Sequence, residues 1–231
     1  MDGAPENTMA AFQHAVDLGY RYVETDVHAT ADGVLLAFHD DRLDRVTDRT
    51  GVIAELPYDE VRQARVGSEH PIPTFDELLH AWPDLRLNID PKADNAEAPL
   101  IEALRRADAL DRVCIGSFSG ARLDRLRAAL GPGLCTSMGP WDVTRLRFAS
   151  WGLPTGSFAA NCAQIPLKGY GVYLPDRAFL RAAHARGLKV HVWTINDEAT
   201  MRQLLDVGVD GIVSDETALL KRVLQERGQW S

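Results

Sequence analysis

Two carboxylates two residues apart, Glu24 and Asp26, lie in the run 22–27, whose apolar neighbours are typical of a β-strand. A strand alternates faces with a period of two, so both side chains project to the same side. Paired carboxylates repel each other and are costly to bury, and a cation between them removes that cost. Because hard cations take oxygen ligands, we expect Ca²⁺ or Mg²⁺ here rather than Zn²⁺. A solvated strand face is the alternative.

A histidine and an aspartate, His39 and Asp40, close the next apolar run. An unperturbed histidine titrates at about pH 6.5, which suits proton transfer near neutrality, and the aspartate could orient its ring. The Asp-Gly dipeptide at 32–33 favours a hairpin, which would set His39 roughly opposite Glu24. If the second strand is instead parallel, both groups lie near strand ends. Either arrangement predicts that His39 lies close to the carboxylate pair.

A third polar group lies in the run 85–92, where leucines and an isoleucine alternate with Asn88, Asp90 and Lys92. The alternation predicts a strand with an apolar face and a polar face. In a barrel, such a strand would direct the polar trio into the barrel or its mouth. A surface Asp-Pro turn with a solvated lysine is the alternative.

The rest of the chain alternates between strand-like runs and helical stretches, which is typical of a βαβ series. We predict strands at 22–28, 34–39, 85–90, 112–118, 133–138, 161–166, 188–195 and 210–214. We predict helices from Asn7 to near Gly19 and at 74–82, 96–108, 119–130, 142–149, 176–186, 197–207 and 215–227. This alternation favours an α/β fold of the TIM type, a (β/α)₈ barrel forming one domain over residues 1–231. A doubly wound sheet is the alternative, but no glycine-rich dinucleotide loop follows the first strand.

Composition excludes several classes of function. The chain has 231 residues, 45% hydrophobic and 25% charged, with a net charge of −8 and no basic stripe. A nucleic-acid partner is therefore not expected, and neither is adhesion to an anionic membrane. No leader or transmembrane run is visible, so we expect no stable membrane insertion. The three cysteines, Cys114, Cys135 and Cys162, lie in apolar runs and are predicted to be buried free thiols, which suits the reducing cytoplasm.

Several short motifs follow one another in a specific order and spacing. They are Pro5-Glu6-Asn7-Thr8, Glu24-Thr25-Asp26, Asp32-Gly33, His39-Asp40-Asp41-Arg42-Leu43-Asp44-Arg45, Pro73-Thr74-Phe75-Asp76-Glu77-Leu78-Leu79, Leu87-Asn88-Ile89-Asp90-Pro91-Lys92, Val192-Trp193-Thr194-Ile195-Asn196 and Gly208-Val209-Asp210-Gly211-Ile212. In this order the chain resembles the glycerophosphodiester phosphodiesterase family over nearly its whole length. The resemblance implies a barrel of the phospholipase C-like phosphodiesterase kind. It also implies metal-dependent cleavage of glycerophosphodiesters to sn-glycerol 3-phosphate and an alcohol.

The resemblance assigns roles to particular residues. Glu24, Asp26 and Asp90 match the metal carboxylates, although the family usually has a glutamate at the third position. Lys92 matches a lysine that binds the phosphate, and His39 matches a catalytic acid or base.

Further matches concern supporting groups. Trp193 matches an aromatic residue of the substrate pocket, with core packing as the alternative. Glu6 and Asn7 match a motif at the barrel mouth, and Asn7 could also cap the following helix. The segment 42–73, rich in proline and glycine, matches an insertion near the site mouth.

The family pattern also begins with a short strand ending in His-Arg-Gly, for which the sequence leaves no room after Met1. His14 cannot replace its histidine, because it lies within a predicted helix. We therefore expect a first strand and a second histidine upstream of Met1, with 34–39 as the strand outside the barrel. The alternatives are a catalytically impaired barrel that binds phosphoesters or a protein partner, and a phosphodiester lyase of the sphingomyelinase D kind.

Overall fold

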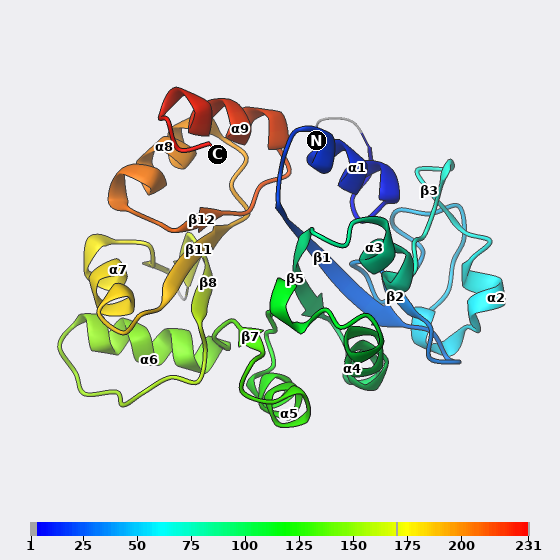
Figure 1. Cartoon of the computed structure of the whole chain (residues 1–231), viewed down its shortest axis with the longest axis horizontal. Helices are drawn as coiled ribbons and strands as arrows, with labels where there is room; N and C mark the ends of the chain where they lie inside the picture. The colour runs from blue at the N-terminus through cyan, green and yellow to red at the C-terminus, as the bar shows by residue number, and fades with distance from the viewer. Residues whose placement is uncertain (1–3, 170, 231) are drawn as a thin grey trace. The chain divides into compact units, whose positions relative to one another are not determined.

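The computed structural model describes residues 4–169 and 171–230, and the first strand expected upstream of Met1 lies outside these residues. The described chain divides into two compact units. The N-terminal unit contains residues 4–117 and 121–135, and the C-terminal unit contains 118–120, 136–169 and 171–230. Figure 1 labels the elements of both units.

The main sheet of the N-terminal unit is built from parallel strands with one antiparallel edge strand. Strand β1 (Tyr22–Ala29) pairs in parallel with β5 (Arg86–Pro91), which pairs in parallel with β6 (Val113–Ile115). Strand β2 (Leu35–Ala37) pairs with β1 in the antiparallel sense, and β7 (Cys135–Thr136) ends the strand order at the unit boundary.

The hairpin predicted from the Asp-Gly dipeptide is confirmed. Gly33 takes a φ of +83°, a conformation that glycine adopts without strain, and the chain reverses between β1 and β2. The N–H of Phe38 donates to the carbonyl of Asp26 at 2.9 Å, so the pairing continues beyond β2. The following residue, His39, is thereby brought beside β1 near Asp26, as predicted, and β2 lies outside the parallel series.

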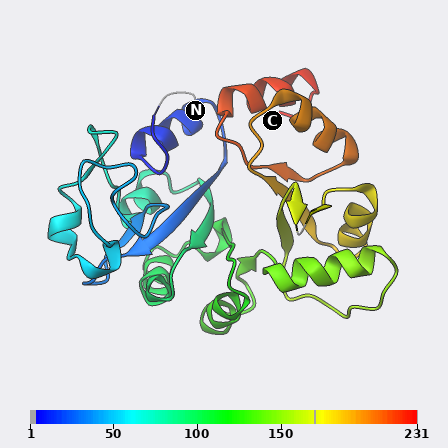
Figure 2. The ribbon, with the colours of Figure 1, turned by 180° about the vertical axis from the view of Figure 1, so that it is seen from behind.

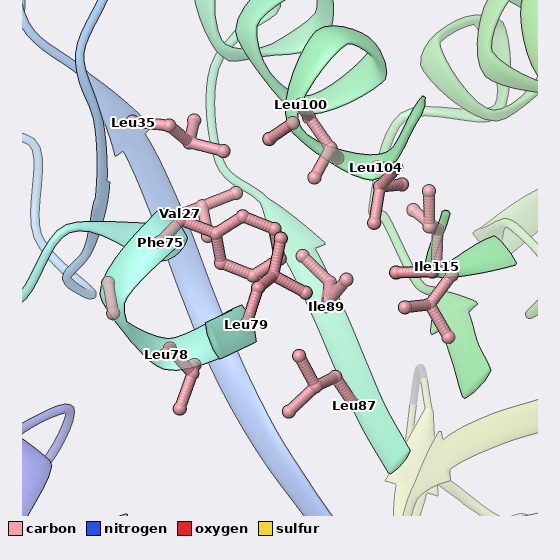
Figure 3. Packing of buried hydrophobic residues seen from close by; sticks show 14 of the residues in the cluster. Val27, Leu35, Phe75, Leu78, Leu79, Leu87, Ile89, Leu100, Leu104 and Ile115 are labelled. Carbon is pink, nitrogen blue, oxygen red and sulfur yellow. The ribbon is translucent and has the colours of Figure 1, made fainter. Parts of the chain in front are cut away.

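The core of this unit covers one face of β1 and β5. Helices α3 (Phe75–Ala81) and α4 (Glu97–Arg106) pack their leucines against the strands (Figure 3). The contacting side chains are Val27, Leu35, Phe75, Leu78, Leu79, Leu87, Ile89, Leu100, Leu104 and Ile115. Because side chains alternate along a strand, the polar residues of β1 and β5 occupy the other face.

Further helices and one capping motif complete this unit. They are α1 (Met9–Asp17), α5 (Gly120–Leu130) and the 3₁₀ turns η2 (Asp94–Ala96) and η3 (Leu110–Arg112). Helix α3 begins with a capping box, in which the Thr74 hydroxyl accepts from the N–H of Glu77 and the Glu77 carboxylate accepts from the N–H of Thr74.

The segment 42–73 forms an ordered excursion with a core of its own. It contains η1 (Ile53–Glu55), α2 (Tyr58–Val61) and an antiparallel pair, β3 (Arg65–Val66) with β4 (His70–Pro71). Its buried side chains are Leu43, Ile53, Val61, Ala64, Val66 and Ile72, which cluster with Leu36 and Phe38. The segment 42–73 does not follow the alternation of strands and helices, and this hydrophobic cluster explains why it nevertheless has a defined conformation.

The C-terminal unit contains a parallel sheet in the order β12-β11-β8. The strands are β8 (Cys162–Pro166), β11 (Lys189–Trp193) and β12 (Gly211–Ile212), and a short pair is formed by β9 (Lys168–Gly169) and β10 (Val172–Tyr173). The helices are α6 (Pro140–Ser150), α7 (Arg177–His184), α8 (Glu198–Val207) and α9 (Thr217–Glu226). Helix α6 lies beside α7 and α8 beside α9, as Figures 1 and 2 show.

The structure also tests two expectations about burial and membranes. No helix within the described residues is long and apolar enough to cross a membrane.

All three cysteines are free thiols, and Cys162 is buried as predicted. The prediction of burial was wrong for Cys114 and Cys135, which are half-buried. In β6, Cys114 alternates with the buried Val113 and Ile115, so it projects from the face opposite to the helices.

A buried arginine connects α6 to the start of α7, and its loss should destabilise the protein. Arg147, 5% exposed, donates to Asp176 Oδ2 at 2.8 Å and to the carbonyls of Tyr173 and Leu174 at 3.0 and 2.5 Å. Arg147→Met removes these three hydrogen bonds of a buried group, so we expect urea unfolding to show a loss of about 1–3 kcal/mol. The exposed Arg181→Met is the control, expected within about 0.5 kcal/mol of wild type. An unchanged midpoint for Arg147→Met would contradict this role.

Candidate active site

The carboxylates predicted to hold a cation lie on alternate residue pairs of the β1–β5 ladder. In this parallel register Glu24 is the partner of Asn88, and Asp26 is the partner of Asp90. Asp26 is 6% exposed, whereas Glu24 and Asp90 are half-buried. The polar faces that sequence alternation predicted for the two strands therefore meet at one place.

Lys92 connects the two aspartates. Its Nζ lies 2.6 Å from Asp26 Oδ1 and 2.9 Å from Asp90 Oδ2. Burial by itself would lower the pKa of Lys92, but the two carboxylates outweigh it and the pKa is raised. Burial raises the pKa of Asp90, against the opposing effect of Lys92. The alternative of a solvated lysine on a surface turn is wrong, because the ammonium group of Lys92 is held at the aspartates.

Asn7 restrains the β1 end of the Asp26, Asp90 and Lys92 cluster through hydrogen bonds to Asp26 and Thr25. Its Nδ2 donates to Asp26 Oδ2 at 3.3 Å, and its Oδ1 accepts from the Thr25 hydroxyl at 2.7 Å. The prediction that Asn7 could cap α1 was wrong, because Thr8 is the N-cap and accepts from the N–H of Ala11. Asn7 takes a φ of +54°, a left-handed conformation that turns its amide toward β1 instead.

His39 belongs to a second polar network in the same unit. Its Nδ1 lies 2.7 Å from Asp40 Oδ1, so Asp40 orients the ring as the sequence suggested. Arg45 contacts both oxygens of Asp40, through Nε at 2.6 Å and Nη2 at 3.0 Å, and its Nη2 also donates to Glu6. The hydrogen bond from Arg45, with a smaller contribution from His39, lowers the pKa of Asp40 to about 2. The His39 side chain is 50% exposed, so its ring is accessible.

His28 supports the backbone at this point. Its Nε2 lies 3.1 Å from the carbonyl oxygen of His39, and because a carbonyl only accepts, Nε2 carries the proton. Burial lowers the pKa of His28, against the raising effect of that bond. A neutral His28 at the end of the hairpin therefore fixes the main chain that carries His39.

The C-terminal unit contains an aromatic pair of its own. Trp193 ends β11 half-buried, and its ring packs edge-on against Phe118 at a centroid distance of 5.8 Å. Phe118 is 68% exposed although it is large and apolar. Sequence reasoning missed Phe118. The available signal was an aromatic residue at the carboxyl end of the predicted strand 112–118, which is where barrel sites form.

The carboxylates present have the donor chemistry that suits a hard divalent cation, but their side chains are not grouped as a metal site. Within residues 4–169 and 171–230, no three His, Cys, Asp or Glu side chains are grouped closely enough to hold a metal ion. Asp26 and Asp90, however, already share one cationic group, the Lys92 ammonium, through an oxygen of each. Carboxylate oxygens from neighbouring strands are the donors that Ca²⁺ and Mg²⁺ prefer.

Comparison with known proteins decides the family. Residues 2–219 match the profile of the Glycerophosphoryl diester phosphodiesterase family. The chain belongs to this family. A Mycobacterium tuberculosis protein named probable glycerophosphodiester phosphodiesterase 2 is 41% identical, over 98% of this chain and 88% of its own. A glycerophosphodiester phosphodiesterase of Caldanaerobacter subterraneus is 28% identical, over 97% and 94% of the two chains.

Solved structures of the family share its fold. A glycerophosphodiester phosphodiesterase from Agrobacterium tumefaciens matches with a TM-score of 0.79 and 25% identity, covering 95% of this chain and 94% of that one. An Oleispira antarctica phosphodiesterase, solved with the product sn-glycerol-3-phosphate, matches with a TM-score of 0.80 and 26% identity, covering 96% and 92%. The fold is therefore the TIM-type α/β barrel of these phosphodiesterases, and the doubly wound alternative is wrong.

Proposed function

We propose that this protein is a metal-dependent phosphodiesterase that hydrolyses glycerophosphodiesters, such as deacylated phospholipids, to sn-glycerol 3-phosphate and an alcohol. The observation that carries the proposal is the cluster of Asp26, Asp90 and Lys92 on paired strands of a glycerophosphoryl diester phosphodiesterase chain. The relative with the bound product supports the same chemistry. We further propose that residues 1–231 act as one domain and that the protein functions in the cytoplasm, where its free thiols would persist.

Hydrolysis of a phosphodiester requires charge neutralisation and two proton transfers. A Ca²⁺ or Mg²⁺ ion held by Glu24, Asp26 and Asp90 would neutralise the non-bridging phosphate oxygens when bound. The Lys92 ammonium lies against two of these carboxylates and would contribute a second positive charge to a phosphate there. An anionic substrate is compatible with a chain of net charge −8, because a bound divalent cation together with Lys92 would offset the negative charges of Glu24, Asp26 and Asp90.

His39 supplies the acid–base group. Nδ1 of its ring contacts Asp40, which leaves Nε2 to accept a proton from an attacking hydroxyl or donate one to the leaving alkoxide. Asn7 and Glu6 support the site from the segment before α1, through Asp26 and Arg45 respectively. Trp193, whose ring packs against Phe118, stays a proposed substrate-pocket residue on the family resemblance. The segment 42–73 provides Arg45, which supports its assignment to the site mouth.

Metal binding can be tested without measuring turnover. We expect isothermal titration to show binding of Ca²⁺ or Mg²⁺ to the wild-type protein and loss of that binding in Asp26→Asn, which removes a ligand charge. Asp17→Asn is the control, because Asp17 lies on α1 and accepts from Gln13 at 2.7 Å. Binding that persists unchanged in Asp26→Asn would reject Asp26 as a ligand.

A further inference from the structure

Arg45 joins three segments that are far apart in the sequence. Its guanidinium contacts Asp40 at the end of the hairpin and Glu6 in the segment before α1, while Arg45 itself lies in the excursion 42–73. Asp40 in turn accepts from His39 Nδ1 at 2.7 Å. The contacts therefore run without a break from Glu6 to the imidazole ring of His39.

The geometry restricts the Asp40 carboxylate in two ways. Oδ2 accepts from Arg45 Nε at 2.6 Å, and Oδ1 accepts from Arg45 Nη2 at 3.0 Å while also facing His39 Nδ1. A planar guanidinium that donates to both oxygens fixes the plane of a carboxylate, because any rotation breaks one of the two bonds. Glu6 also accepts from Nη2, so Arg45 is restrained as well.

A fixed and ionised Asp40 selects one form of the histidine. A carboxylate only accepts hydrogen bonds, so His39 must carry a proton on Nδ1. In the neutral ring Nε2 then has the free lone pair. Without Arg45, the carboxylate could turn away, and the ring would be free to adopt the other tautomer or another rotamer.

A contribution to the folding stability of the protein explains this network poorly. The Arg45 side chain is 53% exposed, and exposed ion pairs contribute only about 0.2–1 kcal/mol. The network joins three charged groups, Glu6, Arg45 and Asp40, next to a histidine. Orientation of that histidine explains the network better.

We propose that Arg45, held by Glu6, is a positioning residue that fixes Asp40 so that His39 presents Nε2 to the reacting oxygen. The inference deepens the proposed function and rests on it for the role of His39. Arg45 itself does not touch the substrate in this account. Its loss should therefore lower kcat by at least about 10-fold, or about 1.4 kcal/mol, and change KM little.

The direct test is the state of the His39 ring, read from its ¹⁵N chemical shifts in the substrate-free protein. Wild type should show the ring proton on Nδ1, the nitrogen that contacts Asp40. Arg45→Ala should show a mixture of tautomers, together with the fall in kcat. The control is Arg42→Ala in the same segment, because Arg42 is 49% exposed and contacts Asp44 rather than Asp40. It should leave the ring signals and kcat as in wild type.

Two further variants keep the test decisive. If Arg45→Ala does not fold, Arg45→Lys keeps the charge but not the two-point contact, and it should show the same changes to a smaller extent. Glu6→Gln weakens the restraint on Arg45 and should act in the same direction. Unchanged ring signals and kcat in folded Arg45 variants would overturn the proposal.

Failure of the proposed function can be distinguished from failure of the positioning role of Arg45. If wild-type protein does not cleave glycerophosphodiesters, the proposed activity is wrong. The ¹⁵N signals still decide the role of Arg45 in that case, since they require no substrate. A wild-type His39 without a proton on Nδ1 would overturn the positioning role even in an active enzyme.

Discussion

Replacing His39 by alanine is expected to lower kcat on a glycerophosphodiester by about 10²–10⁴-fold, the usual contribution of a general acid–base group. The physical reason is geometric. Asp40 contacts Nδ1 of the ring and half of the side chain is exposed, so Nε2 is accessible to a substrate oxygen. Because His39 is exposed and does not belong to the buried core, we expect thermal unfolding of His39→Ala to resemble that of wild type.

The matched control is His80→Ala. His80 is also exposed, and its Nδ1 contacts a backbone carbonyl, that of Asp76 at 2.7 Å within α3. Its removal should leave kcat unchanged. Equal activity of His39→Ala and wild type would show that proton transfer at this site does not depend on His39.

Replacing Lys92 by methionine is expected to lower kcat/KM by more than about 10-fold, a loss above about 1.4 kcal/mol. Methionine keeps much of the length of the side chain and removes its charge. The Lys92 ammonium is the cationic group at Asp26 and Asp90, so its loss removes positive charge from the place where the phosphate is expected to bind. Steady-state kinetics with glycerophosphoethanolamine measures the effect.

A second consequence follows from the same contacts. Without Lys92, two largely buried carboxylates face each other, so added Ca²⁺ or Mg²⁺ should raise the melting temperature of Lys92→Met more than that of wild type. Lys189→Met is the control, because Lys189 pairs with Asp210 at 2.9 Å but is 68% exposed. Unaltered kcat/KM in Lys92→Met would remove Lys92 from phosphate recognition.

Local patterns were sufficient for most of the fold. Alternation at 85–92 gave both the β5 strand and its polar face, and the Asp-Gly dipeptide gave the β1–β2 hairpin. Both are properties of neighbouring residues, so a sequence shows them directly. The same holds for the capping box at Thr74, which starts α3 where the pattern predicted a helix.

Features that depend on distant residues were less predictable. The short pairs β3–β4 and β9–β10 have too few residues for a periodicity, and they depend on packing around them. The prediction for Asn7 as a cap was wrong because a long-range contact with Asp26 outweighs the local one. In the same way, no spacing in the sequence shows that Arg45 reaches both Asp40 and Glu6.

The candidate site shows the same division. Alternation placed Glu24 with Asp26 and Asp90 with Lys92, and the family resemblance assigned their roles. The sequence could not show that the Lys92 ammonium rests between two aspartates, because this contact depends on the parallel register of β1 and β5. The contact of Phe118 with Trp193 likewise joins residues far apart in the sequence, one in the loop after β6 and one at the end of β11.

The most direct test of the central claim is product analysis by ³¹P NMR. The protein is incubated with glycerophosphoethanolamine and Ca²⁺ or Mg²⁺, beside samples containing a chelator or the His39→Ala variant. The account predicts that sn-glycerol 3-phosphate accumulates in the metal-containing wild-type sample and is strongly reduced in the other two. Intact substrate in all three samples, or a cyclic phosphate as the final product, would contradict the assignment as a glycerophosphodiester hydrolase.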